Sequence, residues 1–183
     1  PLEGDLFGDR SAVRHTIPDF SRAGWCALAL KPDSNEWAIR VLGPVCRPLP
    51  QTAACAEHVA PGLVSQLVEG ASIYHGDNRS ALANFRRSAL QAARPSLMYG
   101  GLLLYSSRFE AARRVQEFRW VRARQEAAGK SGRELREIVG NTEADRGAEE
   151  GRLMHPVIDT RDHDLRLRHA RLVHAPCRGV HTV

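Results

Sequence analysis

Leu6-Phe7-Gly8-Asp9-Arg10-Ser11 and Ile73-Tyr74-His75-Gly76-Asp77-Asn78 are the two stretches that decide the fold. Each begins apolar and reaches an aspartate that is followed by a polar residue. Ligands of open α/β sheets gather where strands end, so two such stretches on adjacent central strands would bring Asp9 and Asp77 together. The sequence therefore predicts a sheet whose central strands end on acidic residues.

Three further strands are expected around this pair. Residues 24–30 and 36–42 have strand-like composition, and the turn residues at 32–35 between them predict a hairpin. Residues 115–121 alternate between two faces, which predicts a fifth strand. Residues 11–22 are polar and are expected to form a long loop.

Helices are expected after the third strand. Thr52 suits the N-cap of a helix that carries Glu57. Pro61 lacks the N–H that would bond the carbonyl of Glu57, and a continuous helix would lose about 3 kcal/mol there. The helix is therefore expected to kink or restart just after Glu57.

The later part of the chain predicts two more helices. Residues 79–93 form one helical stretch, and residues 134–150 form another, with an interruption at Gly140-Asn141 where a new helix could be capped. Residues 95–107 are expected to be irregular. The order β-β-β-α-β-α-β-α is that of a mixed α/β sheet with helices on its faces.

Composition limits the class of protein. The chain has 183 residues and a net charge of +5, and Lys31 and Lys130 are its only lysines. An arginine excess favours a polyanionic partner, although a G·C-rich genome produces the same excess without selection for binding. No apolar run approaches the roughly 20 residues of a membrane-spanning helix, which predicts a soluble protein.

The cysteines and the first residue bear on the cellular context. Cys26, Cys46, Cys55 and Cys177 share no CxxC spacing, as expected for reduced thiols of an intracellular protein, cytoplasmic or nuclear. The chain begins with Pro1 and shows no targeting peptide, so it is expected to be an excised or partial chain.

Four acidic residues stand where this layout would gather them: Asp9, Glu57, Asp77 and Asp145. Clustered carboxylates repel one another unless cations neutralise them, and Mg²⁺ prefers such oxygen ligands. Two such ions can hydrolyse a phosphodiester. Spacing alone leaves a second interpretation open, because acids at strand ends are commonly solvated turn residues.

Six short motifs resemble those of type 1 ribonuclease H domains, most closely the forms attached to retroelement reverse transcriptases. They occur in that family's order: LFGDRS at 6–11, RAGWC at 22–26, QTAACAE at 51–57, IYHGDN at 73–78, WVRAR at 120–124 and GNTEADRGA at 140–148. The resemblance implies a ribonuclease H-like mixed five-stranded sheet with helices on both faces, over residues 4–151. Residues 152–183 would be a basic tail rich in His and Arg.

The resemblance also implies a function. Asp9, Glu57, Asp77 and Asp145 would be catalytic and would bind two Mg²⁺ or Mn²⁺ ions, and the domain would cleave the RNA strand of an RNA–DNA hybrid. Substrate would be bound by four residues of the same motifs: Asn78, Arg122, Arg124 and Asn141. The domain is expected to be monomeric, and to be part of a larger polyprotein.

The sequence departs from the family's motifs at several positions. Gly8 and Arg10 replace a hydroxyl residue and a glycine beside Asp9, and Arg124 replaces a histidine. An arginine binds phosphate but does not titrate near neutrality, so it cannot shuttle protons. The alternative hypothesis is therefore a catalytically decayed domain that binds nucleic acid without cleaving it.

Three further interpretations remain open. Asp19 competes with Asp9 for the first acidic position, although Asp9 is preferred because it follows an apolar strand. His174, Cys177 and His181 have metal-ligand types but are better interpreted as part of the tail. Six arginines could line a phosphate groove or form a solvated face: Arg108, Arg113, Arg114, Arg119, Arg122 and Arg124.

Overall fold

A computed structural model describes residues 2–16, 20–156, 161 and 164–165 of the chain. Five strands form one sheet in the order β3-β2-β1-β4-β5. Strand β1 is central, antiparallel to β2 and parallel to β4, and β5 is parallel to β4. The predicted mixed five-stranded sheet is thus confirmed. The strands are β1 (Leu2–Val13), β2 (Arg22–Leu30), β3 (Trp37–Pro44), β4 (Val68–Gly76) and β5 (Val115–Trp120).

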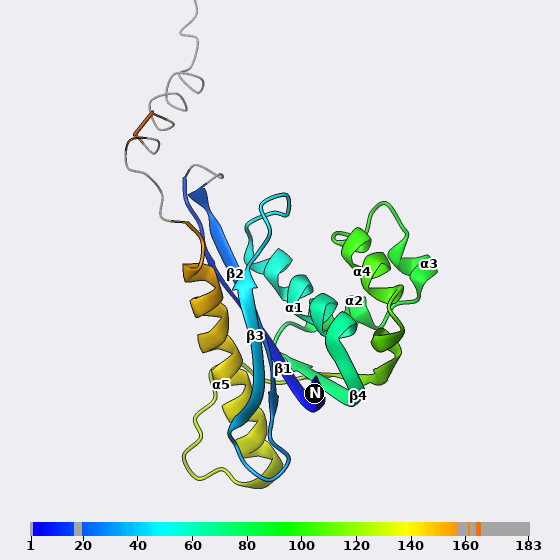
Figure 1. Cartoon of the computed structure of the whole chain (residues 1–183), viewed down its shortest axis with the longest axis vertical. Helices are drawn as coiled ribbons and strands as arrows, with labels where there is room; N and C mark the ends of the chain where they lie inside the picture. Colours follow the sequence, from blue (N-terminus) through cyan, green and yellow to red (C-terminus); the bar gives the residue numbers. More distant parts are fainter. Residues whose placement is uncertain (1, 17–19, 157–160, 162–163, 166–183) are drawn as a thin grey trace, which may run out of the picture.

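Helices cover both faces of this sheet. They are α1 (Ala53–Leu67), α2 (Arg79–Phe85), α3 (Ala89–Ala92), α4 (Gly100–Ser107), the 3-10 helix η2 (Glu110–Arg114) and α5 (Gly132–Leu153). Figure 1 shows α5 alone on one face and α1 to α4 on the other. Within the described residues, no helix is both long enough and apolar enough to cross a bilayer.

The first connection is shorter than predicted. Residues 11–13 continue β1 instead of starting a loop, because they pair with residues 22–24 of β2. The backbone hydrogen bonds of an antiparallel ladder outweigh the polar composition of this segment. Strand β3 likewise extends to Pro44, two residues beyond the strand predicted at 36–42.

Helix α1 is continuous through Pro61, so the predicted restart after Glu57 is wrong. Pro61 is buried, as are Val59, Ala60 and Val64 around it. Burial of this face against the sheet offsets the roughly 3 kcal/mol that a proline costs inside a helix. Glu57 is therefore held by an uninterrupted helix.

The segment between α2 and β5 also differs from the prediction. The single helix expected over 79–93 is two helices, since α2 ends at Phe85 and Ser88 starts α3 with a capping box to Gln91. The segment 95–107, predicted to be irregular, contains α4. The sequence signal was weak there because α4 begins with Gly100-Gly101, and glycine has low helix propensity.

Helix α5 runs unbroken through Gly140-Asn141, where an interruption was predicted. Gly140 is needed for close packing: a Cβ there would lie 2.5 Å from ring carbons of Phe7 on β1. Gly147 lies equally tightly against Cys26 on β2. Small residues on one face of α5 thus let the helix lie directly on the central strands.

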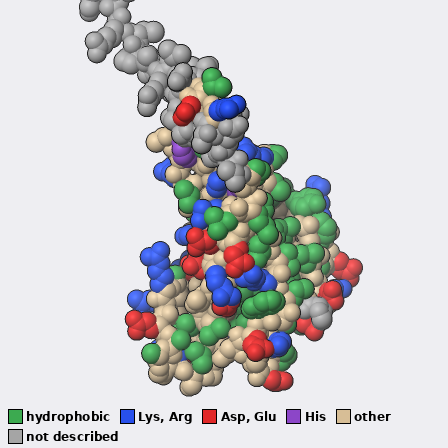
Figure 2. All heavy atoms as spheres, turned by 60° about the vertical axis from the view of Figure 1, so that its left-hand side comes forward, with side chains coloured by type: hydrophobic (Ala, Val, Ile, Leu, Met, Phe, Trp, Pro, Cys, Tyr) green, Lys and Arg blue, Asp and Glu red, His purple; other side chains and the backbone are tan. Residues whose placement is uncertain are grey.

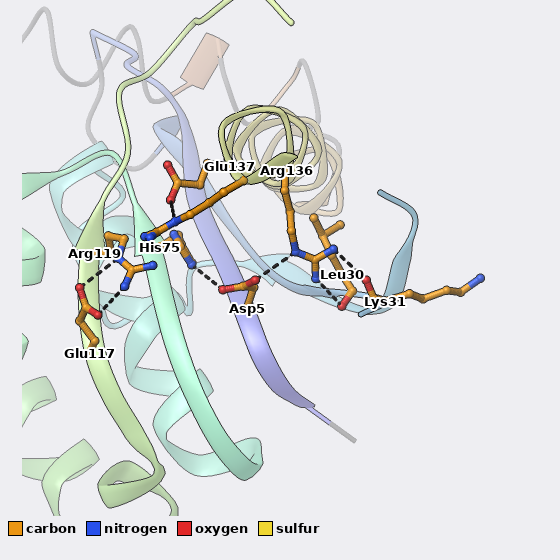
Figure 3. Close-up of polar contacts among 9 residues, drawn as sticks. Asp5, Leu30, Lys31, His75, Glu117, Arg119, Arg136 and Glu137 are labelled. Atoms are coloured by element: carbon orange, nitrogen blue, oxygen red, sulfur yellow. Dashed lines mark hydrogen bonds and ion pairs between the residues drawn. The ribbon is translucent and has the colours of Figure 1, made fainter. Parts of the chain in front are cut away.

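A polar network joins the start of α5 to β1, to β4 and to the turn between β2 and β3 (Figure 3). The guanidinium of Arg136 donates to Asp5 Oδ2 over 3.0 Å and to the backbone carbonyls of Leu30, Lys31 and Ser34. Asp5 Oδ1 lies 3.0 Å from Nε2 of the buried His75 on β4. Arg136 therefore ties the β2–β3 turn and β1 to the start of α5.

The outer surface of α5 carries charges of both signs. Figure 2, which brings this side forward, shows blue and red side chains mixed together. Several form ion pairs, among them Arg40 of β3 with Glu150, whose Nη2 and Oε2 atoms are 2.6 Å apart. Helix α5 ends at Leu153, two residues beyond the predicted domain boundary, and His155 Nε2 lies 2.9 Å from the carbonyl of Ala23.

We expect Gly140→Ala to destabilise the protein by about 1–3 kcal/mol, because the added methyl group would displace either the Phe7 ring or the helix. The measurement is equilibrium unfolding in urea. Gly101→Ala is the matched control, since a Cβ at Gly101 meets nothing within 4 Å. If both variants have the same free energy of unfolding, α5 does not depend on this close contact.

Candidate active site

Asp9 and Asp77 lie next to each other on two neighbouring strands. Asp9 is on β1, and Asp77 follows directly after β4. The parallel pairing aligns Phe7 with His75, so both aspartates lie two residues beyond one aligned pair. Strand pairing alone therefore brings the two carboxylates to one edge of the sheet.

Glu57 reaches this edge from the start of α1. Thr52 caps the helix as predicted, accepting a hydrogen bond from the N–H of Cys55 over 3.1 Å. Gln51 fixes the helix start to the sheet: its Oε1 accepts from the N–H of Ala23, and its Nε2 donates to the carbonyl of Val45. The polar residues before α1 thus set the position of Glu57.

The three carboxylates form a compact group. One oxygen of each of Asp9, Glu57 and Asp77 lies within 4.8 Å of the others. Asp9 is 3% exposed and Glu57 is 5% exposed, while Asp77 is half-buried. This is the grouping that the sequence predicted for three of its four acids.

Asp145 lies at the rim of the same site. It is exposed on α5 and lines an open cavity of about 510 Å³ together with Asp9 and Asp77. It is not part of the tight group of three. Asn141 lies one helical turn earlier and lines the same cavity.

Burial and crowding raise the pKa values of two of the acids. Burial, followed by the neighbouring charge of Asp77, raises the pKa of Asp9 to about 7. Burial and the charges of Asp9 and Asp77 raise the pKa of Glu57 to about 8. Both carboxylates are thus destabilised in their charged form when no cation is nearby.

Arg10 forms an ion pair with this group. Its Nε lies 3.0 Å from Glu57 Oε1, and its backbone N–H donates to Asp9 Oδ1 over 2.7 Å. Neither Arg10 Nε nor Glu57 Oε1 has a well-directed hydrogen bond. The contact is an ion pair of loose geometry. The sequence showed that Arg10 replaces a glycine of the family's motif, but it did not predict the ion pair with Glu57.

The residues predicted to bind substrate divide into three groups. Asn141 and Arg124 line the larger cavity with the acids. Asn78 caps α2 by accepting from the N–H of Ala81, and it lines a second cavity of about 350 Å³ beside Glu57 and Asp77. Arg122 is exposed and lines neither of these two cavities.

Arg124 has a left-handed backbone, with φ of 52°. This conformation is unusual for a residue other than glycine and costs of the order of 1–3 kcal/mol. Such strain is typical of residues held in place at functional sites. The exposed Arg124 side chain lines the same cavity as Asp9, Asp77 and Asp145 and adds a positive charge there.

Sequence reasoning missed two structural supports of the site. The indole of Trp120 donates from Nε1 to the backbone carbonyl of Asp77 over 2.8 Å, and Arg79 stacks on the Trp120 ring at 3.9 Å. Beneath the acids, Gly8 leaves the space that the phenol of Tyr74 occupies. The unusual glycine at position 8 was the available signal for the second support.

The set of six arginines does not form one groove. Arg119 pairs with Glu117, and Arg114 donates to the carbonyl of Val68, whereas only Arg124 of the six lines the acidic cavity. Asp19, His174, Cys177 and His181 lie outside the described residues, so their interpretations stay untested. Of the described cysteines, Cys26, Cys46 and Cys55 are free thiols.

The donor set fits a divalent cation. Three carboxylates offer oxygen ligands within 4.8 Å of one another, and Glu57 Oε1 is buried without a directed hydrogen bond. Hard ions such as Mg²⁺ and Mn²⁺ take such oxygen ligands and remove the repulsion that raises the two pKa values. The residues at this edge of the sheet are therefore suited to hold such an ion.

The raised pKa values predict how stability depends on pH. A folded protein with a raised carboxyl pKa keeps a proton that the unfolded chain has released, so its free energy of unfolding falls as pH rises between the two values. In chelator, we expect stability to fall between about pH 5 and pH 8. Asp9→Asn should flatten this slope.

Thermal unfolding across this pH range is the measurement. Glu69→Gln, at the opposite end of β4 and exposed, is the control and should keep the wild-type slope. A slope that Asp9→Asn leaves unchanged would show that these carboxylates do not titrate as the geometry requires.

No protein-family model matches the sequence, and no curated protein matches it significantly. Solved structures do match the fold. The ribonuclease H domain of prototype foamy virus superposes with a TM-score of 0.57 at 14% identity, covering 82% of this chain and 94% of that domain. The type 1 enzyme LC9-RNase H1 superposes with a TM-score of 0.56 at 16% identity, covering 85% of this chain and 75% of that one.

A larger viral protein contains the same fold. The foamy viral protease-reverse transcriptase, solved in complex with an RNA/DNA hybrid, superposes with a TM-score of 0.57 at 12% identity. The match covers 82% of this chain but only 20% of that chain. These likenesses agree with the strand order and the helix positions described above, and the chain therefore has the ribonuclease H fold.

Proposed function

We propose that this domain is a metal-dependent endonuclease that hydrolyses the RNA strand of RNA–DNA hybrids. The observation that carries the proposal is the group of Asp9, Glu57 and Asp77, crowded within 4.8 Å on a ribonuclease H fold. Buried like charges weaken a fold unless a bound cation offsets their repulsion. The gathering of these three acids from β1, α1 and the residue after β4 is therefore best explained by cation binding.

The proposed cofactor is a pair of Mg²⁺ or Mn²⁺ ions. Asp9, Glu57 and Asp77 would supply ligands from the sheet and α1, and Asp145 would supply one from α5. Bound ions of this kind activate water and stabilise the leaving oxygen of a phosphodiester. The protein's own task is to hold the four carboxylates on rigid elements, which the strand pairing and the packing of α5 accomplish.

The proposed substrate contacts surround these acids. Arg124 and Asn141 line the larger cavity, and Asn78 lines the smaller one. Arg124 would bind a phosphate through its guanidinium, and Arg122 would add a second positive charge on the same segment. Arginine stays charged across the working pH range, so Arg124 would hold substrate without transferring protons.

The proposed biological setting is a retroelement polyprotein, in which this chain would be a monomeric, intracellular domain. The foamy viral protein that shares the fold is much longer than the matching part, and its structure contains an RNA/DNA hybrid. Its size and partner support the proposal for this chain.

A second candidate function is binding of nucleic acid without cleavage. The contact between Arg10 and Glu57 favours it, because a guanidinium already compensates one of the four carboxylates. The retention of all four acids favours the nuclease. The two functions differ in their metal dependence, since binding through phosphates depends on salt and does not require divalent ions.

We expect wild-type protein to cleave a labelled RNA–DNA hybrid in Mn²⁺, and Asp77→Asn to lower the rate at least about a hundredfold, because the variant loses a charged oxygen ligand. Glu69→Gln, on the same strand at the opposite end, should cleave like wild type. Equal cleavage by wild type and Asp77→Asn would contradict the nuclease. Hybrid binding in chelator without any cleavage in Mg²⁺ or Mn²⁺ would establish the binding function instead.

We expect Arg124→Gln to weaken hybrid binding by several-fold and to reduce the salt slope by about one, as loss of a single phosphate contact should. Fluorescence anisotropy at several salt concentrations is the measurement. The control is Arg133→Gln, because Arg133 pairs with Glu137 near the start of α5 and lines neither acidic cavity. Equal salt slopes in the two variants would rule out a phosphate contact at Arg124.

A further inference from the structure

Arg10 lies at the centre of the acidic site. It lines both the cavity of about 510 Å³ beside Asp145 and the cavity of about 350 Å³ beside Asn78. Its side chain is 40% exposed, whereas the Glu57 side chain that it contacts is 5% exposed. A half-exposed cation thus reaches inward to a buried carboxylate.

This ion pair uses an oxygen that a metal ion would need. Arg10 Nε lies 3.0 Å from Glu57 Oε1, and Glu57 is a member of the compact group of three carboxylates. A guanidinium and a divalent ion on the same carboxylate repel each other and compete for its lone pairs. Arg10 therefore opposes cation binding at Glu57 as long as it stays in this position.

The geometry also allows the Arg10 side chain to move away from Glu57. Neither Arg10 Nε nor Glu57 Oε1 has a well-directed hydrogen bond, so the pair has few directional constraints. The cavities on both sides of the side chain offer it solvated alternatives. The backbone of Arg10 is fixed by pairing with Trp25 on β2, so only the side chain has to move.

We propose that Arg10 is an internal competitor of the divalent cation at Glu57. Its guanidinium compensates the Glu57 carboxylate when no cation is bound, leaves that carboxylate when a cation binds, and then faces the cavity where a substrate phosphate would lie. The inference rests on the proposed function in one respect, namely that Glu57 is a cation ligand.

The test measures Mn²⁺ binding to the full chain by calorimetry and electron paramagnetic resonance, at fixed pH and without substrate. Arg10→Met removes the guanidinium and keeps a long side chain in β1. We expect it to bind Mn²⁺ about tenfold more tightly than wild type, because the cation no longer displaces a charged partner. Its melting temperature should be lower than that of wild type in chelator and should rise more on addition of Mn²⁺.

The matched control is Arg79→Gln. Arg79 lines the same smaller cavity but stacks on Trp120 instead of contacting Glu57. The substitution removes one positive charge at the site and therefore measures the general electrostatic effect. We expect it to change the Mn²⁺ affinity less than twofold. Arg10→Gln is the second variant at position 10, to be used if Arg10→Met does not fold, and should change affinity in the same direction as Arg10→Met.

The outcomes distinguish the competition at Glu57 from the proposed metal-dependent function. If variants at Arg10 bind Mn²⁺ no more tightly than Arg79→Gln does, the competition is disproved, while hybrid cleavage by wild type would leave the proposed function intact. If neither wild type nor any variant binds Mn²⁺ at millimolar concentration, both the competition and the metal-dependent function are disproved.

Discussion

The repulsion among Asp9, Glu57 and Asp77 is the constraint on which the site depends. The backbone brings these carboxylates together through the parallel pairing of β1 with β4 and the capped start of α1. Burial then raises the pKa values of Asp9 and Glu57 to about 7 and about 8. The fold must therefore be stable enough to hold an arrangement that, without a cation, works against it.

Close packing of α5 supplies part of that stability and completes the site. Gly140 and Gly147 let the helix pack directly on Phe7 of β1 and Cys26 of β2. Asp145 lies on the same helix and reaches the rim of the acidic cavity. A helix held further away by larger side chains would move Asp145 away from the other acids, so packing and function share the same residues.

Much of this arrangement was predictable from the sequence. The strands around Asp9 and Asp77, the hairpin, the Thr52 cap and the grouping of the acids follow from local pattern and from the rule that sites form at strand ends. Two of the errors concern Pro61 and Gly140, where local propensity predicts a break. At both positions tertiary packing outweighs local helix propensity. A local sequence pattern does not show packing partners that are far apart in the chain.

The contacts made by long side chains could not be predicted from the sequence for a similar reason. Arg10 precedes Glu57 by many residues, and its ion pair depends on where α1 crosses β1. The support of Asp77 by Trp120 depends in the same way on the pairing of β4 with β5. Such contacts are consequences of the assembled fold.

Two arginines give this site a charge balance of its own. Arg10 forms an ion pair with Glu57, and Arg124, which has a left-handed backbone, lines the larger acidic cavity. A guanidinium does not release its proton near neutrality, so an arginine is not suited to relay protons. Any proton movement at this site must therefore involve the carboxylates, water or the substrate itself. In the proposed function, the arginines would act through their position and charge on where cations and phosphates bind.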